Sequence, residues 1–247
     1  MKNFWSVAGI CFILLVWKGA SLLVAQDLLL PSPESVLAKL VALVTTPRFL
    51  QSLLRTFFRL LSALAVSIPL GIVAGLVSGL STRAAAFLRP LFSIVSTTPV
   101  MSIILIAFLW FGAERTPAFA AFLMVFPVIT ANVMTGIKAI DPKLGELFAV
   151  YRMDMREKIR YLYLPSLAPF IAGGCRASLS MCWKVVVAAE VLVQPLLALG
   201  TGMQRAKAAL DTAELFSWTA ATIIVAALSE AALWSLMRKR KRRSYGG

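Results

Sequence analysis

Long apolar runs separated by short polar segments dominate the chain. Six of them are long enough to cross the hydrocarbon core of a bilayer as helices, at about 4–24, 57–80, 86–111, 117–137, 165–193 and 216–237. Because backbone polar groups in lipid must be satisfied within the segment itself, such runs predict helices. The pattern therefore predicts an all-α, polytopic membrane helix bundle with six transmembrane helices, in a single domain over residues 1–247.

The first run allows two interpretations. Lys2 followed by an apolar stretch resembles the start of a secretory signal, but the run is long for one and no clear A-x-A cleavage site follows it. We expect a retained first helix over 4–24, with a cleaved signal as the alternative.

Residues 31–55 differ from the six spans because their apolar positions form a stripe. Ser32 and Pro33 are typical of a helix start, since serine caps free N–H groups and proline lacks one. The stripe consists of Val36, Leu37, Leu40, Val41 and Val44. The segment is predicted to be an amphipathic helix on the outer side, lying in the interface or, since its polar face is not strongly basic, packed on the bundle.

A charged segment at 138–164, which we call the elbow, interrupts the spans. Asp141 before Pro142 is a good helix start, and Asp154 with Glu157 three residues later has the spacing of a reciprocal capping box. Two short helices are therefore predicted, and a soluble partner is expected to bind this folded segment.

The second of these helices is predicted to be amphipathic. Met155, Ile159 and Leu162 recur at helical spacing, whereas the basic residues between them face elsewhere. Pro165 is expected to end this helix and to begin the next apolar run.

Composition and charge narrow the possible functions. Sixty per cent of the residues are hydrophobic and fifteen per cent are charged, which is far from the balance of a soluble domain. The net charge of +14 comes from Lys and Arg at the ends of apolar runs, where they act as membrane anchors, so no nucleic-acid partner is expected. The sequence has no histidine, no phosphate-binding G-x-x-x-x-G-K-[ST] loop and no plausible catalytic pair of carboxylates. We expect a chain that is not an enzyme and that binds no cofactor of its own.

The distribution of basic residues predicts the orientation. With the N-terminus inside, fifteen Lys and Arg fall on the cytoplasmic side, seven outside and three within spans. Six of the fifteen form the run RKRKRR at 238–243. The positive-inside bias therefore places both termini and the elbow in the cytoplasm.

The elbow carries a family resemblance. The spacing from Glu146 through Ala149 to Leu164-Pro165 resembles the EAA loop in permease subunits of bacterial ABC importers, although Phe148 replaces an alanine of that pattern. Segments that look like the nitrate/sulfonate/taurine branch extend this resemblance from about Leu29 to Glu190: LLPSPESV at 29–36, the stretches 54–80 and 88–115, and Pro169, Ile171, Gly174, Arg176, Trp183, Ala189 and Glu190.

This resemblance implies a MetI-like, type I permease architecture in a bacterial inner membrane. It further implies a homodimer, two ABC ATPase subunits that carry ATP and Mg, and an extracytoplasmic binding protein that delivers a small solute. The residues expected to couple the chain to the ATPase are Glu146, Ala149, Arg152, Met153, Asp154, Met155, Arg156, Ile159, Leu164 and Pro165. In particular, the short helix after Arg152 would sit in a groove of the ATPase.

Arg152 departs from the family pattern, which has glycine at this position. A left-handed backbone costs a non-glycine residue about 1 kcal/mol or more. Either the elbow turns with another geometry, or Arg152 has been recruited to contact the partner.

Polar residues within the spans are candidates for a substrate path. Thr97, Thr98 and Ser102 could face the path, or their hydroxyls could satisfy carbonyls freed by Pro99. In a neighbouring span, the small-residue row of Gly71, Gly75 and Gly79 is expected to serve close helix packing, with a kink at Pro69 as the alternative.

Charged residues within the spans are the other candidates. Lys184 could meet an anionic substrate, but pairing with Glu190 or Glu230 would explain it equally well. Two other classes remain open: a secondary transporter that uses Glu190 or Glu230 as an ion-coupled site, and a membrane scaffold that moves no solute. The solute itself, whether a sulfonate, nitrate, a vitamin or a pyrimidine precursor, is left open.

Overall fold

Helices make up every regular element that the structure describes. The computed structural model describes the backbone of residues 2–244, and the side chains of all of these except 2, 3, 6, 145, 149, 155 and 236–244. The helices are α1 (Lys2–Val24), α2 (Pro33–Val44), α3 (Pro47–Leu80), α4 (Thr82–Thr97), α5 (Val100–Lys138), α6 (Pro142–Val150), α7 (Met155–Glu157), the π-helix η1 (Lys158–Tyr163), α8 (Leu164–Val193), α9 (Leu199–Ala208) and α10 (Thr212–Ser244). The all-α prediction is therefore confirmed for residues 2–244.

Four segments of the described chain are long and apolar enough to cross a membrane. They are Val7–Val24, Pro47–Leu80, Val100–Lys138 and Thr212–Ser235. The long helix α8 is not among them, and it carries three charged residues, Arg176, Lys184 and Glu190.

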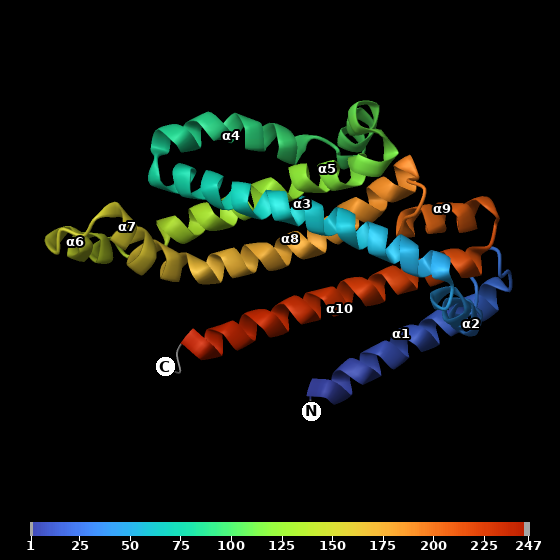
Figure 1. Cartoon of the computed structure of the whole chain (residues 1–247). Helices are drawn as coiled ribbons and strands as arrows, with labels where there is room; N and C mark the ends of the chain where they lie inside the picture. The colour runs from blue at the N-terminus through green and yellow to red at the C-terminus, as the bar shows by residue number, and fades with distance from the viewer. Residues whose placement is uncertain (1, 245–247) are drawn as a thin grey trace.

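The centre of the molecule is formed by α3, α5 and α8, which run side by side in Figure 1. Small residues on α3 allow α5 to approach closely: Gly71 faces Ile129, and Gly75 faces Val133. A Cβ atom at Gly75 would lie 2.6 Å from Cβ of Val133. The expectation that this glycine row serves helix packing is confirmed, and α3 continues through Pro69.

The remaining long helices are attached to this centre more loosely. In Figure 1, α4 lies above α3, at the top of the view, and α10 and α1 lie below α8, on the opposite side of the bundle. The Oγ of Ser217 on α10 donates to the carbonyl of Val36 on α2, at 2.9 Å. Near the end of α1, the indole of Trp17 donates to the carbonyl of Pro31 at 3.1 Å, and Lys18 pairs with Glu34.

The boundaries predicted for 31–55 are wrong. The Oγ of Ser32 accepts from the N–H of Ser35, as a helix cap should, but the amphipathic helix ends at Val44. Thr46 then caps a new helix with Pro47 in its first turn, so residues 47–55 belong to the long helix α3.

The prediction of one continuous helix over 86–111 is also wrong. The helix breaks at Thr98-Pro99, where both residues adopt extended backbone angles, because a residue before proline is disfavoured in the helical region. A second break follows at Gly112, with φ 67° and ψ 178°, and it separates the arm 100–111 from the arm 113–138. Next to this break, the hydroxyl of Thr116 donates to the carbonyl of Gly112 at 2.7 Å.

Candidate coupling loop and substrate path

The first helix of the elbow is α6, and local hydrogen bonds fix both of its ends. Oδ1 of Asp141 accepts from the N–H of Lys143 at 2.9 Å, so the predicted cap is confirmed. At the other end, the N–H of Met153 donates to the carbonyl of Phe148 at 3.1 Å, the 6→1 bond of a Schellman motif. The helix therefore stops sharply and the chain reverses after it.

Arg152 occupies the left-handed position of this motif, with φ 50°. The elbow thus keeps the geometry that glycine usually adopts, and the alternative of a different turn is wrong. The side chain of Arg152 is exposed. Ala25, Gln194 and Leu210 are also left-handed non-glycine residues just beyond helices, so Arg152 is not a unique exception in this chain.

We expect Arg152→Gly to stabilise the elbow by about 1 kcal/mol, because glycine reaches positive φ without a steric penalty. Hydrogen exchange of the amides at 151–154 should become roughly fivefold slower, as measured by mass spectrometry. Arg156→Gly is the matched control: it replaces an arginine inside helix α7, where glycine is unfavourable, and exchange should become faster. Faster exchange in Arg152→Gly would contradict a strained turn at this residue.

The second half of the elbow begins with the predicted capping box. The N–H of Glu157 donates to Oδ1 of Asp154 at 2.7 Å, and the N–H of Asp154 donates to Oε2 of Glu157 at 2.9 Å. Both bonds of the reciprocal pair are present, so the prediction is confirmed.

The prediction that Pro165 ends this second helix is wrong. Residues 155–193 run on without a break through α7, η1 and α8, and Pro165 lies in the first turn of α8. In the π-helical turn, the N–H of Leu164 donates to the carbonyl of Ile159, five residues back, and such a widened turn accommodates the proline ring directly after it. Because the π-helical turn alters the spacing, the residues of the predicted apolar face do not all lie on one side: Leu162 is buried, whereas Ile159 is 46% exposed.

The separate short helix of the elbow is therefore α6, and it presents an apolar ridge to solvent. Leu144, Leu147 and Tyr151 recur at positions i, i+3 and i+7, and together with Val150 they form a ridge whose members are 41% to 78% exposed. Glu146 on the same helix is exposed, and Met153 is half-buried. The side chains of the predicted coupling residues Ala149 and Met155 lie outside the described residues.

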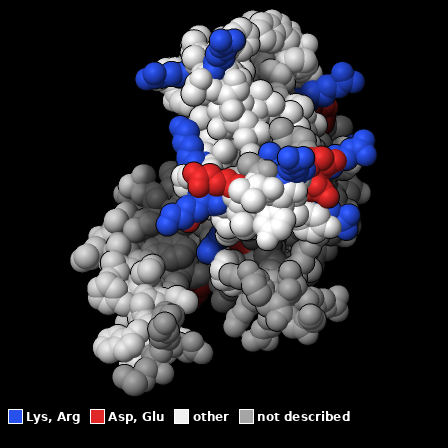
Figure 2. Space-filling model, turned by 90° about the vertical axis from the view of Figure 1, so that its left-hand side faces the viewer, with Lys and Arg blue, Asp and Glu red and all other residues white. Residues whose placement is uncertain are grey.

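Charged side chains surround this ridge. Figure 2 looks onto the end of the molecule that carries the elbow and shows Lys and Arg spread widely over it, with Asp and Glu gathered nearer its middle. Arg152, Asp154 and Arg156 are exposed there, and Leu164 and Pro165 are exposed where the elbow joins α8. An apolar ridge with a charged rim is the pattern of a protein interface.

The hydroxyls predicted to line a path near Pro99 are engaged locally. Oγ1 of Thr97 donates to the carbonyl of Ser93 at 2.8 Å, and Oγ1 of Thr98 donates to the carbonyl of Ile94 at 2.7 Å. The carbonyl of Ile94 also accepts from the N–H of Thr98, so it is not a carbonyl freed by Pro99. A role of Thr97 and Thr98 in the substrate path stays a prediction. Ser102, in the first turn of α5, is half-buried.

Glu190 is completely buried in an ion-pair cluster that joins three helices. Its Oε1 accepts from Nη1 of Arg59 on α3 at 2.9 Å, and its Oε2 accepts from Oγ1 of Thr56 and from the N–H of Gly200. Arg59 also pairs with Glu114 on α5, whose other carboxylate oxygen accepts from the N–H of Leu196. We call Arg59, Glu114 and Glu190 the Arg59 cluster.

The Arg59 cluster joins α3, the second arm of α5 and α8 to the loop between α8 and α9, whose residues Leu196 and Leu197 bond to Glu114 and Arg59. No local pattern in the sequence predicts the partners of Arg59. The signal that could have found it is its position inside the predicted span 57–80, where an isolated charge requires a counter-charge. Because Glu190 is buried and fully paired, it is not a free carboxylate for substrate or for a coupling ion.

Lys184 is exposed on α8, and no ion pair involving it occurs among the described side chains. Pairing with Glu190 is wrong, since Glu190 binds Arg59 instead. The neighbouring cation Arg176 lies over the ring of Trp234 on α10, at 5.0 Å from the centroid. Among the charges of α8, Lys184 is therefore the one that the described structure leaves available for a ligand.

Outside the long spans, one further ion pair joins α2 to the start of α10. The carboxylate of Asp211 accepts from Nζ of Lys39, and this bond lowers the pKa of Asp211 and raises the pKa of Lys39. Asp211 also accepts from the N–H of Glu214 at 2.9 Å and so caps α10.

Comparison with known proteins decides the family. A model described as binding-protein-dependent transport system inner membrane component matches residues 67–238. The chain belongs to this family. The match extends from the middle of α3 to the last turns of α10 and includes the whole elbow.

The relatives of this permease are transport subunits. It is similar to the taurine transport system permease protein TauC of Escherichia coli, with 27% identity over 241 residues that cover 95% of this chain and 87% of that protein. It is also similar to the putative aliphatic sulfonates transport permease protein SsuC of Bacillus subtilis, with 27% identity over 186 residues (73% and 66% of the two chains). The formylaminopyrimidine transport permease protein ThiX of Halalkalibacterium halodurans is 29% identical over 171 residues, 68% of each chain.

These matches confirm the resemblance to the taurine and sulfonate branch. The permease is a membrane subunit of an ABC importer and not an enzyme. The family assignment favours this class over an ion-coupled transporter, whose proposed carboxylate Glu190 is in any case paired with Arg59.

Proposed function

We propose that the permease forms the helical pathway of an ATP-driven importer and receives mechanical work at α6. Two copies pair around one pathway, each with six transmembrane helices and both termini in the cytoplasm. Two ABC ATPase subunits, which hold ATP and Mg, bind the elbows from inside, and a binding protein delivers the solute from outside.

The observation that carries this proposal is the exposed apolar ridge of α6. Leu144, Leu147, Val150 and Tyr151 are large side chains that the described chain leaves 41% to 78% exposed. In the proposed orientation they lie on the cytoplasmic side, outside the hydrocarbon core. A groove on the ATPase would remove them from water. The part of the elbow after Asp154 then acts as a lever, because it is one continuous helix with α8 and transmits displacement without a joint.

The ridge can be tested with Leu147. Leu147→Asp places a charge at the middle of the ridge and should abolish co-purification of the ATPase and reduce ATP-driven uptake in proteoliposomes to less than about a tenth. Leu147→Met is the matched control, since it keeps an apolar side chain of similar volume and should behave as the unaltered protein. Because Leu147 is half exposed, the thermal midpoint of both variants should be unchanged. Full uptake by Leu147→Asp would exclude α6 as the docking helix.

We further propose that the solute is a small anion and that Lys184 contacts it. TauC and SsuC are named for taurine and aliphatic sulfonates, and another relative is named a bicarbonate transport system permease protein. Lys184, on an exposed face of α8, could compensate the charge of such a solute at membrane depth.

Lys184→Ala should lower uptake about tenfold while leaving the thermal midpoint unchanged, and Lys184→Arg should retain most of the uptake because it keeps the charge. Uptake of a radiolabelled sulfonate into proteoliposomes is the measurement. Equal uptake by Lys184→Ala and the unaltered protein would remove this lysine from the pathway.

A further inference from the structure

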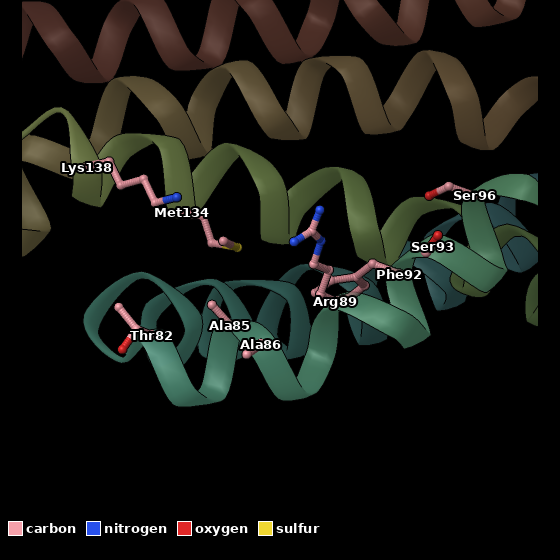
Figure 3. A pocket seen from close by; sticks show the side chains of 9 residues that line it. All are labelled: Thr82, Ala85, Ala86, Arg89, Phe92, Ser93, Ser96, Met134 and Lys138. Atoms are coloured by element: carbon pink, nitrogen blue, oxygen red, sulfur yellow. The ribbon is translucent and has the colours of Figure 1, made fainter.

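A crevice of about 670 Å³ separates α4 from α5 near the end of the molecule that carries the elbow. Figure 3 shows Arg89 on α4 directed across the crevice towards α5, with Met134 and Lys138 on the opposite wall. Direct contact between α4 and α5 is sparse compared with the contacts that α5 makes with α3 and α8. The crevice is therefore a gap between α4 and the membrane-spanning helix α5 that the described chain does not fill.

The charged residues of the crevice are all basic. Arg89 and Lys138 line it, and no Asp or Glu does. Among the described side chains neither cation takes part in an ion pair. Hydroxyls of Ser93 and Ser96 add hydrogen-bond donors on the α4 wall. This lining suits an oxyanion, which would be held by two positive charges without competition from a carboxylate.

The rest of the lining is mostly apolar and open to the side. Four other lining residues, Ala85, Ala86, Phe92 and Met134, are apolar, and Phe87 on the adjoining face of α4 is 83% exposed. A water-soluble anion gains nothing from an apolar wall, whereas the acyl chain of a lipid does. The ligand that matches both parts of the crevice is therefore amphiphilic.

One of the two cations lies at the end of its helix, since Lys138 is the last residue of α5. Arg89 is near the middle of α4, about two turns after Thr82, where α4 starts immediately after α3 ends. The elbow leaves the bundle directly after Lys138. Basic pockets between membrane helices on the cytoplasmic side are suited to anionic phospholipid headgroups.

We propose that this crevice binds an anionic phospholipid, with its phosphate held by Arg89 and Lys138 and its acyl chain along the apolar wall between α4 and α5. The bound lipid fills the gap and fixes α4 to α5 next to the elbow. Binding of an anionic lipid in this crevice does not depend on the importer function. Only the statement that the lipid comes from the inner leaflet rests on the proposed orientation.

The test compares lipid retention by native mass spectrometry on the full chain, delipidated and then titrated with phosphatidylglycerol or phosphatidylcholine. The unaltered protein should retain phosphatidylglycerol selectively, and Arg89→Gln/Lys138→Gln should bind it at least about tenfold more weakly. Arg83→Gln/Lys143→Gln removes two cations from the same end of the molecule but outside the crevice, and should bind as the unaltered protein does. Equal retention by the crevice variant, or equal retention of the two lipids, would overturn the proposal.

A second part of the experiment distinguishes binding of a lipid from binding of a free anion. Millimolar inorganic phosphate or methanesulfonate should not displace bound phosphatidylglycerol, because neither has an acyl chain for the apolar wall. If either displaces it, or binds in a manner that requires Arg89 and Lys138, the crevice is a site for small anions and the lipid proposal is wrong. Should the double variant fail to fold, Lys138→Gln alone must still weaken lipid binding several-fold for the proposal to stand.

Discussion

Replacing Glu190 with alanine is expected to destabilise the permease more than any other single change considered for this chain. The substitution leaves Arg59 buried, with 5% of its surface exposed, and removes the buried carboxylate that faces it at 2.9 Å, so that only the half-exposed carboxylate of Glu114 remains opposite this charge. Removing one partner of a buried ion pair typically costs about 3–5 kcal/mol, a large part of the net stability of a folded domain. The thermal midpoint in detergent, followed by size-exclusion chromatography with fluorescence detection, should fall by many degrees.

Two further variants show whether the loss of stability in Glu190→Ala comes from an unbalanced buried charge or from lost side-chain packing in the Arg59 cluster. Glu114→Ala removes a carboxylate whose side chain is 57% exposed, so its loss should cost no more than about 1 kcal/mol. Arg59→Leu/Glu190→Leu removes both buried charges and should restore much of the stability lost in Glu190→Ala. A normal thermal midpoint in Glu190→Ala would show that the pair does not hold α3 and α8 together.

Gly75→Leu is expected to have the second largest effect, because it forces α3 away from α5. A Cβ atom at this position would lie 2.6 Å from Cβ of Val133 and 2.9 Å from the backbone carbonyl oxygen of Thr130. A backbone atom cannot move aside as a flexible side chain can, so the helices must separate, at a cost of about 1–3 kcal/mol or more. The yield of folded protein in membranes and its thermal midpoint measure this cost.

Gly173 provides the matched control for Gly75. It lies on α8, and a Cβ atom there would meet nothing within 4 Å. Gly173→Leu should therefore leave the thermal midpoint close to that of the unaltered protein. Leucine favours a helix more than glycine does, so propensity alone would stabilise both variants. Similar losses in Gly173→Leu and Gly75→Leu would therefore mean that the added side chain itself, and not the close approach of α3 to α5, explains the effect.

Features that depend on neighbours in the sequence could be predicted. The caps at Ser32, Asp141 and Asp154 were all identified, because each cap and its partner lie within three residues and side-chain geometry alone determines the bond. The packing row of Gly71, Gly75 and Gly79 could be predicted for a similar reason, since spacing four on a helix is sufficient to place small residues on one face.

Features that depend on distant residues or on altered helix geometry could not be predicted. Arg59 and Glu190 are 131 residues apart, and no periodicity in either helix indicates that the two side chains meet. Helix rules predict an end at Pro165, whereas the π-helical turn before it lets the helix continue from the elbow into α8. The same turn moved Ile159 away from the face that α-helical spacing predicts.

Cysteine accessibility at the elbow tests the central claim most directly. In a variant whose three native cysteines are replaced by alanine, Lys143→Cys on α6 should react with a membrane-impermeant maleimide in inside-out vesicles but not in intact cells, and bound ATPase should protect it. Lys207→Cys on α9 should react in intact cells. Labelling of Lys143→Cys in intact cells, or equal labelling in vesicles with and without the ATPase, would contradict the assignment of the elbow as the site that receives mechanical work.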